Sequence, residues 1–214
     1  MRSRHNHTNP NTMSKIKNIV FDLAGVVFAR NKERCPKELM DYFYFINSGE
    51  ALPDFWNDYD RGTRTFDAVA EALAEYRSSD VQTARHMMAT AITYQDQIPE
   101  TAELIAELKG AGYRVFVLSN MSKEYIDYLR KMPVYSHFDD DIVSCEVGLT
   151  KPEKEIYTLL LERFGLEPSQ TMFIDDRLEN IQAAAEVGIV PLHFSTANAQ
   201  QSCDNIRKAV GLEC

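Results

Sequence analysis

Cysteine is scarce in this sequence, and the few cysteines are scattered. The 214 residues include only Cys35, Cys145, Cys203 and Cys214, and no two of these form a C-x-x-C pair. A disulfide framework or a cysteine-rich zinc site is built from closely spaced cysteines, so the sequence predicts neither. We therefore expect a cytoplasmic protein.

The sequence also has fewer basic than acidic residues, and it has no long apolar run. Lysine and arginine number 23 against 32 aspartate and glutamate residues, which gives a formal net charge of -9. Nucleic acids and anionic membranes bind through basic patches, and a membrane-spanning helix needs about 20 consecutive apolar residues. The composition therefore argues against nucleic-acid and membrane partners. The 44% of hydrophobic residues is still enough for a substantial core.

Short runs of apolar residues recur along the chain and predict strands. They are Ile19–Phe21, Arg114–Leu118, Asp141–Cys145, Thr171–Ile174 and Ile189–Leu192. Near-continuous apolar runs are typical of strands buried on both faces of a parallel sheet, and Pro191 favours an edge position for the last one. Helical patterns lie between them at residues 100–109, 153–164 and 178–187, and a final helix is predicted over 199–210. This alternation predicts an α/β protein with a doubly wound, Rossmann-like parallel sheet.

Residues 30–97 interrupt this alternation and predict an all-helical insertion. Apolar stripes at helical spacing run through Leu39–Ile46 and Phe66–Leu73, and Asp80 is a candidate cap for a further helix. The aromatic residues of this stretch are first of all candidates for its own core: Phe43, Phe45, Phe55 and Trp56. The sequence thus predicts a disordered polar tail at residues 1–13, a core domain of residues 14–29 and 98–214, and a helical cap domain of residues 30–97.

Polar residues stand where the predicted strands end. They are Asp22, Ser119, Asn120, Lys151, Asp175 and Asp176. Ligands of parallel α/β sheets bind at the carboxyl ends of the strands, so these residues are candidates for one common site. Each of them alone is equally consistent with a role in a turn or at a helix end. The adjacent carboxylates of Asp175 and Asp176 repel each other, and a cation between them would relieve that repulsion.

These residues lie in motifs that resemble those of the haloacid dehalogenase superfamily of phosphotransferases and hydrolases. The motifs are Phe21-Asp-Leu-Ala-Gly-Val, Val117-Leu-Ser-Asn, Thr150-Lys-Pro-Glu and Phe173-Ile-Asp-Asp, in the family's order. Each is weak alone, but together they cover the core from Ile16 to about Phe194. The helical insertion resembles the cap of the first subfamily. The chain is similar to its sugar-phosphate phosphatases, such as the bacterial α-glucose-1-phosphate phosphatases.

The resemblance implies a Mg2+-dependent phosphatase that works through an aspartyl-phosphate. Asp22 would be the nucleophile that attacks phosphorus. Lys151 would hold the phosphoryl oxygens as a positive charge. Ser119 and the main-chain amide of Asn120 would donate hydrogen bonds to the same oxygens.

The resemblance also implies a metal site made of oxygen atoms. Mg2+ would be held by Asp22, by Asp175 and Asp176, and by the main-chain carbonyl of Ala24. The substrate would be a small phosphorylated metabolite, and the related phosphatases favour a sugar phosphate. The sequence leaves open whether the protein is a monomer or a homodimer.

Ala24 departs from the pattern of most phosphatases of the superfamily, which carry a second aspartate at this position. That aspartate protonates the leaving group and activates water, a role typically worth about 10²- to 10⁴-fold. Its absence leaves two alternatives open. One is a 2-haloacid dehalogenase, in which the aspartate attacks carbon without a metal; the other is a binding or regulatory protein with weakened turnover. The Asp175-Asp176 pair favours the phosphatase over the dehalogenase. Arg30 lies near the predicted mouth of the site, where a solvated loop residue is the simplest interpretation.

Overall fold

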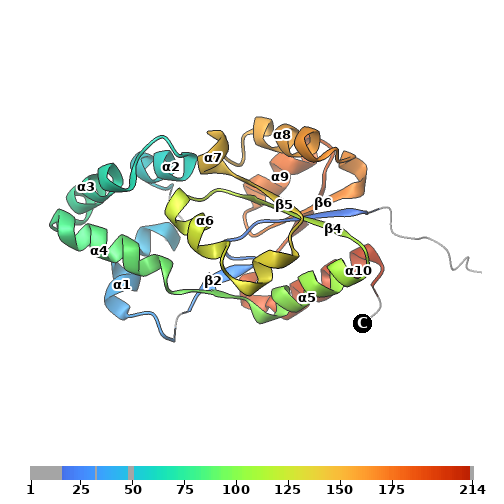
Figure 1. Cartoon of the computed structure of the whole chain (residues 1–214), viewed down its shortest axis with the longest axis horizontal. Helices are drawn as coiled ribbons and strands as arrows, with labels where there is room; N and C mark the ends of the chain where they lie inside the picture. The colour runs from blue at the N-terminus through green and yellow to red at the C-terminus, as the bar shows by residue number, and fades with distance from the viewer. Residues whose placement is uncertain (1–15, 32, 48–50, 213–214) are drawn as a thin grey trace, which may run out of the picture.

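The computed structural model describes residues 16–31, 33–47 and 51–212. The predicted tail at residues 1–13 therefore lies outside the described residues. Figure 1 shows a molecule of two parts, with a sheet and its flanking helices at one end and a group of helices at the other.

A parallel sheet with the strand order β5-β4-β1-β6-β7 forms the first part. The strands are β1 (Asn18–Phe21), β4 (Arg114–Ser119), β5 (Asp140–Val143), β6 (Thr171–Asp175) and β7 (Val190–His193). The central strands β1, β4 and β6 are buried along almost their whole length, whereas the edge strand β7 alternates between exposed and half-buried residues. This explains why the central strands have continuous apolar sequences. The predicted parallel α/β sheet is confirmed, with Pro191 on an edge strand.

Helices cover both faces of the sheet (Figure 1). One face carries α5 (Pro99–Gly110), α6 (Lys123–Leu129) and α10 (Ala199–Val210), and the other carries α8 (Lys154–Phe164) and α9 (Leu178–Glu186). Short 3-10 turns connect them at η2 (Pro133–His137), η3 (Pro168–Gln170) and η4 (Thr196–Asn198). Ile19 and Phe21 of β1 enter the first buried cluster and Val20 enters the second, as the alternation of side chains along a strand requires.

The strand predicted at Asp141–Cys145 was wrong at its carboxyl end. β5 ends at Val143, and Ser144 already begins a short helix, α7 (Ser144–Val147). The Ser144 hydroxyl accepts a hydrogen bond from the main-chain N–H of Met121 at 2.9 Å and donates one to the main-chain carbonyl of Asp60. These long-range contacts hold Ser144 out of the strand, and no local pattern could have indicated them.

The second part of the molecule is helical, and we call it the helical insert. It contains α1 (Lys37–Tyr42), the turn η1 (Tyr44–Asn47), α2 (Asp54–Arg61), α3 (Phe66–Arg77) and α4 (Val81–Ile92). Phe43, Phe45 and Trp56 are buried in its own core, and Phe55 packs against them. Asp80 caps α4 as expected, because its carboxylate accepts the main-chain N–H of Thr83 at 2.9 Å.

Two short strands form the base of the helical insert. β2 (Phe28–Arg30) and β3 (Gln95–Gln97) pair in antiparallel fashion. The stretch expected to be all-helical, residues 30–97, thus begins and ends in strand residues, which periodicity did not indicate because each strand is only three residues long. Among the described residues, no helix combines the length and the apolar character needed to cross a membrane.

Helix α2 joins the insert to the sheet. The Arg61 guanidinium donates to the carbonyl of Gly148 at 3.0 Å and to the hydroxyl of Thr150 at 2.9 Å, and it also forms an ion pair with Glu153. Gly62, at the end of α2, has a φ of +81° and lies directly against the main chain of Cys145. The insert therefore meets the core through close main-chain contact.

We expect Gly62→Ala to destabilise the protein more than Gly112→Ala. Both glycines have a positive φ, but a Cβ at Gly62 would lie 2.3 Å from the Cys145 carbonyl oxygen, whereas one at Gly112 would meet nothing within 4 Å. Both substitutions force alanine into a positive φ, so this cost is the same for the two variants. The clash with Cys145 should therefore lower the free energy of unfolding by about 1–3 kcal/mol more at Gly62 than at Gly112. Urea denaturation of the two variants measures the difference, and equal losses would contradict the close contact.

Candidate functional site

The strand order brings three of the predicted residues together at one edge of the sheet. β1 lies between β4 and β6, and Phe21 is in register with Val117 and Ile174. Asp22 follows β1, while Ser119 and Asp175 are the last residues of the neighbouring strands. Parallel strands end at the same edge, so adjacent positions in the sheet become adjacent side chains.

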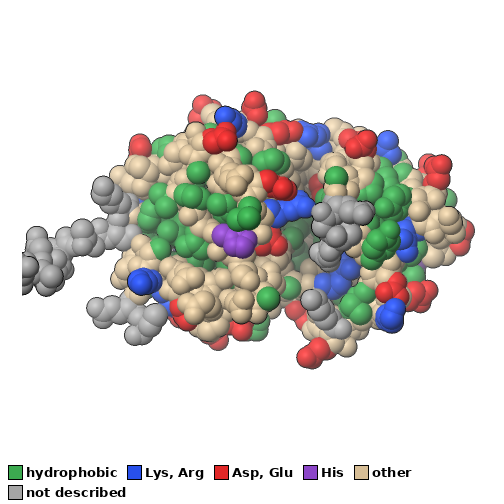
Figure 2. All heavy atoms as spheres, turned by 180° about the vertical axis from the view of Figure 1, so that it is seen from behind, with side chains coloured by type: hydrophobic (Ala, Val, Ile, Leu, Met, Phe, Trp, Pro, Cys, Tyr) green, Lys and Arg blue, Asp and Glu red, His purple; other side chains and the backbone are tan. Residues whose placement is uncertain are grey.

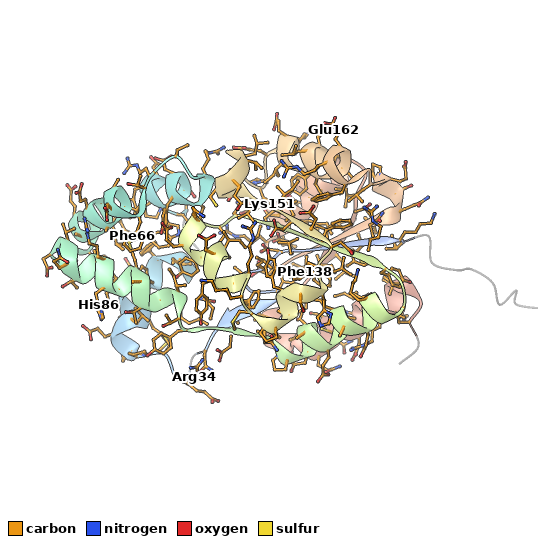
Figure 3. All side chains as sticks on the ribbon, viewed as in Figure 1. Arg34, Phe66, His86, Phe138, Lys151 and Glu162 are labelled. Atoms are coloured by element: carbon orange, nitrogen blue, oxygen red, sulfur yellow. The ribbon has the colours of Figure 1, made fainter. Side chains whose placement is uncertain are left out.

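Lys151 joins these side chains. Its ammonium lies 2.8 Å from Asp22 Oδ1 and donates to Asp175 Oδ2 at 2.6 Å. The Ser119 hydroxyl donates to the same Oδ1 of Asp22 at 2.7 Å. The side chains of Lys151, Asp22 and Asp175 are 1%, 7% and 0% exposed, so this is a buried charge cluster. Figure 3 shows Lys151 near the middle of the molecule, where the sheet meets the helical insert.

Asp175 has its oxygens occupied by protein donors. Besides Lys151, the amide of Asn180 donates to both oxygens at 3.1 and 3.0 Å, and the main-chain N–H of Arg177 donates to Oδ1 at 2.8 Å. The main-chain carbonyl of Asn180 accepts a hydrogen bond from the Tyr157 hydroxyl at 3.0 Å. Sequence reasoning missed Asn180 and Tyr157. The position of Asn180 in the first turn of α9, five residues after Asp175, was the one available signal.

Asn120 holds the main chain of Lys151. Its side-chain amide donates to the Lys151 carbonyl at 2.8 Å and its side-chain oxygen accepts the Lys151 N–H at 2.8 Å. The side chain of Asn120 is therefore engaged with the lysine loop. The phosphate contact predicted for Asn120 runs through its main-chain amide and stays a prediction.

Three carboxylates could hold a metal ion. Asp22, Asp175 and Asp176 each offer an oxygen, and these oxygens lie within 4.8 Å of one another. Asp175 is fully engaged, whereas the Ser119 and Lys151 contacts of Asp22 both end on Oδ1; among the described residues, no hydrogen bond ends on its Oδ2. Hard oxygen donors of this kind fit Mg2+, with Asp22 and Asp176 the more available of the three.

The loop after β1 completes this edge of the site. Gly25 has a φ of +80°, and a Cβ there would lie 2.4 Å from Asp176 Oδ2, so only glycine fits beside this carboxylate. Ala24 is exposed, which means that the position of the missing aspartate opens away from the core. The metal contact predicted for its main-chain carbonyl is untested and stays a prediction.

Burial and neighbouring charges shift the pKa values of the cluster. Burial raises the pKa of Asp22, an effect that Lys151 opposes and Asp175 reinforces. Burial lowers the pKa of Lys151, but Asp175 and Asp22 more than compensate and raise it overall. Burial and the nearby Asp175 raise the pKa of Asp176. Three carboxylates share one ammonium, so the cluster carries an excess of negative charge that a cation would relieve.

Arg30 is not the solvated loop residue that was the simplest interpretation. It lies in β2, is partly buried, and places its guanidinium 5.7 Å from the ring centre of Phe43. Burial raises the pKa of the nearby Tyr125 phenol, and the positive charge of Arg30 opposes this shift. Arg30 therefore lies between the helical insert and α6.

Comparison with known proteins agrees with this geometry. The sequence profile of haloacid dehalogenase-like hydrolases matches residues 16–188. A sesquiterpene phosphatase of Aspergillus oryzae is 30% identical over 200 residues, which cover 91% of this chain and 97% of that protein. A glyceraldehyde 3-phosphate phosphatase of Methanocaldococcus jannaschii is 26% identical over 201 residues, which cover 84% of this chain and 85% of that protein.

A solved structure shares the fold. It is a haloacid dehalogenase family enzyme of Bacteroides thetaiotaomicron in complex with magnesium and inorganic phosphate. It is 25% identical to this chain with a TM-score of 0.69, and the match covers 86% of this chain and 96% of that one. The similarity thus extends over the sheet and the helical insert together.

We expect Lys151→Met to destabilise the protein strongly when EDTA removes divalent cations. The change leaves two buried carboxylates without their ammonium, and breaking a buried ion pair costs about 3–5 kcal/mol. Lys154→Met is the matched control, because the ion pair of Lys154 with Glu186 is exposed to solvent, where such a pair contributes little to stability. Urea denaturation measures both, and a similar small loss in the two variants would argue against the buried cluster.

Proposed function

Because the chain belongs to the haloacid dehalogenase-like hydrolase family, we propose that it is a Mg2+-dependent phosphatase acting on a small phosphate monoester. The observation that carries this proposal is the cluster of Asp22, Asp175 and Asp176 around the buried Lys151. The phosphatases among the relatives support it, as does the related structure that holds magnesium and phosphate.

Asp22 is the nucleophile in this proposal. Its Oδ1 is held by Ser119 and Lys151, so its second oxygen is oriented for attack on phosphorus. The bond from phosphorus to the leaving oxygen breaks as the bond to Asp22 forms. Water then hydrolyses the aspartyl-phosphate, which restores Asp22 and releases inorganic phosphate.

The remaining residues manage charge and position. Lys151 neutralises part of the phosphoryl charge while it holds the nucleophile, and the main-chain amide of Asn120 donates a hydrogen bond to a phosphoryl oxygen. The Ser119 hydroxyl has a single proton, so it turns from Asp22 to a phosphoryl oxygen when the substrate binds. Mg2+, when bound by Asp22, Asp176 and the Ala24 carbonyl with the help of Asp175, would neutralise the rest of that charge. Asp175 acts mainly by fixing Lys151, because its oxygens are already engaged.

The helical insert acts as a cap that selects the substrate. It lies against the carboxyl edge of the sheet through α2 and places partly buried groups there, such as Arg30 and Asp60. We propose a small phosphorylated metabolite, with a sugar phosphate as the first class to test. The relative named as a sesquiterpene phosphatase makes a terpenyl phosphate the second class.

Because Ala24 stands in place of the usual aspartate, a 2-haloacid dehalogenase and a binding protein are the alternatives to a phosphatase. A 2-haloacid dehalogenase needs no aspartate at this position, but its halocarboxylate substrate would meet the excess negative charge of Asp22, Asp175 and Asp176. A binding protein would hold phosphate and Mg2+ without turnover. The first experiment is therefore phosphate release from sugar, glyceraldehyde, flavin and terpenyl phosphates, with Mg2+ and with EDTA. A parallel assay with a 2-haloacid tests the dehalogenase, and release of halide but not phosphate, or binding of phosphate without turnover, would replace the proposal.

We expect Asp22→Asn to abolish phosphate release and leave the fold intact. The amide cannot form the acyl phosphate, so kcat should fall by about 10³-fold or more, on the scale of other lost nucleophiles. Asp127→Asn is the control, because Asp127 is an exposed partner of Lys123 on α6. Phosphate release and thermal unfolding measure the two effects, and normal activity in Asp22→Asn would remove it from the mechanism.

We expect Asp176→Asn to raise the Mg2+ concentration needed for half-maximal activity by at least about tenfold, as seen when groups around a metal are removed. The amide keeps the shape but loses the charge that attracts the ion. Isothermal titration with Mg2+ alone provides a measurement that does not depend on turnover. Unchanged Mg2+ affinity would place the metal elsewhere.

A further inference from the structure

The proposed reaction needs a proton donor that the loop after β1 does not supply. An alkoxide leaves phosphorus readily only when a proton reaches its oxygen, and the following water must lose a proton to attack. The methyl group of Ala24 can do neither. Another group near the end of β1 must therefore carry the proton, unless the substrate has an unusually stable leaving group.

Asp60 is a carboxylate that the helical insert places at this edge of the sheet. It is in the last turn of α2 and is partly buried. Its main-chain carbonyl accepts a hydrogen bond from the Ser144 hydroxyl, and the main-chain N–H of Ser122 is close enough to its carboxylate to lower its pKa. Both residues follow strands at this edge of the sheet, since Ser122 comes three residues after β4 and Ser144 follows β5 directly, at the start of α7.

The contacts of Asp60 place it beside the residues that follow β4. The Ser144 hydroxyl that bonds to the Asp60 carbonyl also accepts the main-chain N–H of Met121, two residues after Ser119, and on the β6 side Arg177 lies close enough to lower the pKa of Asp60. β1 is the single strand between β4 and β6, which are about 10 Å apart at a strand spacing of about 4.8 Å. Asp60 therefore has neighbours on both sides of the end of β1, the strand that Asp22 follows directly. Figure 2 shows acidic and basic side chains together along the indentation between the two parts of the molecule.

We propose that Asp60 is the general acid and base of this phosphatase, in place of the aspartate missing at position 24; this rests on the proposed function above. The carboxyl group of Asp60 gives its proton to the leaving oxygen as the bond between that oxygen and phosphorus breaks and the Asp22–phosphorus bond forms. The Asp60 carboxylate then takes a proton from water as the water oxygen attacks phosphorus and the Asp22–phosphorus bond breaks. The products are the alcohol and inorganic phosphate, and Asp60 regains its proton.

The surroundings of Asp60 suit proton transfer. Burial raises its pKa to about 7, although Arg177 and the Ser122 N–H oppose the shift. Among the described residues, Tyr125 of α6, which lies near the charge of Arg30, and Cys145 of α7 are titratable groups close enough to feel its charge. Asp58 on the same helix differs, since it is paired with Arg64 at 3.2 Å. Asp60 therefore changes charge near neutral pH, which an efficient acid and base must do.

The test compares two leaving groups in Asp60→Asn. Asparagine keeps the size of the side chain and the main-chain carbonyl that accepts from Ser144, so the fold is preserved while the proton is lost. We expect kcat/KM to fall by about 10²- to 10⁴-fold for the best alkyl phosphate of the substrate panel. For 4-nitrophenyl phosphate we expect less than about a tenfold fall, because 4-nitrophenolate leaves without a proton. Asp54→Asn, at the exposed start of α2, is the matched control and should change neither value.

Two further measurements distinguish a chemical role of Asp60 from a structural one. Acid quenching during turnover of 4-nitrophenyl phosphate should show more aspartyl-phosphate in Asp60→Asn than in the wild type, because hydrolysis of the intermediate has lost its base. In the wild type, kcat/KM for the alkyl phosphate should fall above about pH 7 as Asp60 loses its proton. Asp60→Asn should lack this fall.

A double-mutant cycle completes the experiment. Ala24→Asp should restore much of the activity of Asp60→Asn and add little to the wild type, because either carboxylate could transfer the proton. Equal losses for both substrates, no added aspartyl-phosphate, or the same effect of Ala24→Asp in both backgrounds would each overturn the role of Asp60. A wild type that releases no phosphate from any substrate would overturn the proposed function as well.

Discussion

The buried ammonium of Lys151 is the constraint around which the site is built. A charge inside a protein is costly unless it is paired, and Lys151 is paired twice, with Asp22 and Asp175. This pairing requires the ends of β1 and β6 to be neighbours and the Lys151 loop to be fixed against them. Asn120 fixes that loop through both main-chain groups of the lysine. With Asp176 included, one ammonium faces three carboxylates, so the same arrangement that satisfies the lysine leaves an excess of negative charge for a divalent cation.

The division of work among the carboxylates follows from their hydrogen bonds. Asp175 accepts from Lys151, Asn180 and the main chain of Arg177, so its function is to hold other groups in place. Asp22 keeps one oxygen clear of protein donors among the described residues, which suits a nucleophile. Asp176 lies against Gly25 and stays partly exposed, which suits a metal ligand. Three similar side chains are thus suited to different roles because their neighbours differ.

The sequence predicts the sheet and the residues that end its strands, because both leave local signals. A run such as Ile19–Phe21 is apolar throughout since β1 is buried on both faces, and Asp22 follows it directly. Other features depend on contacts between distant parts of the chain. Asn180 reaches Asp175 through its position in the first turn of α9, and the role proposed for Asp60 depends on the docking of α2 on Ser144 at the start of α7. Periodicity identifies the faces of a helix but not where the helix lies against the core, so these residues could not be assigned from pattern alone.

Placing the proton donor on the helical insert would couple chemistry to substrate binding. An aspartate at position 24 would belong to the core and would be in place whether or not the insert was closed. Asp60 is in place only when α2 is docked on the core. Arg61 holds α2 there by donating to Gly148 and Thr150, and Gly62 packs against the main chain of Cys145. Any substrate that pushes the insert away would then still be able to occupy the phosphate site, but it would lose proton transfer. Substrates that fit beneath the insert would react quickly, so selection would act on the rate of the chemical step as well as on affinity.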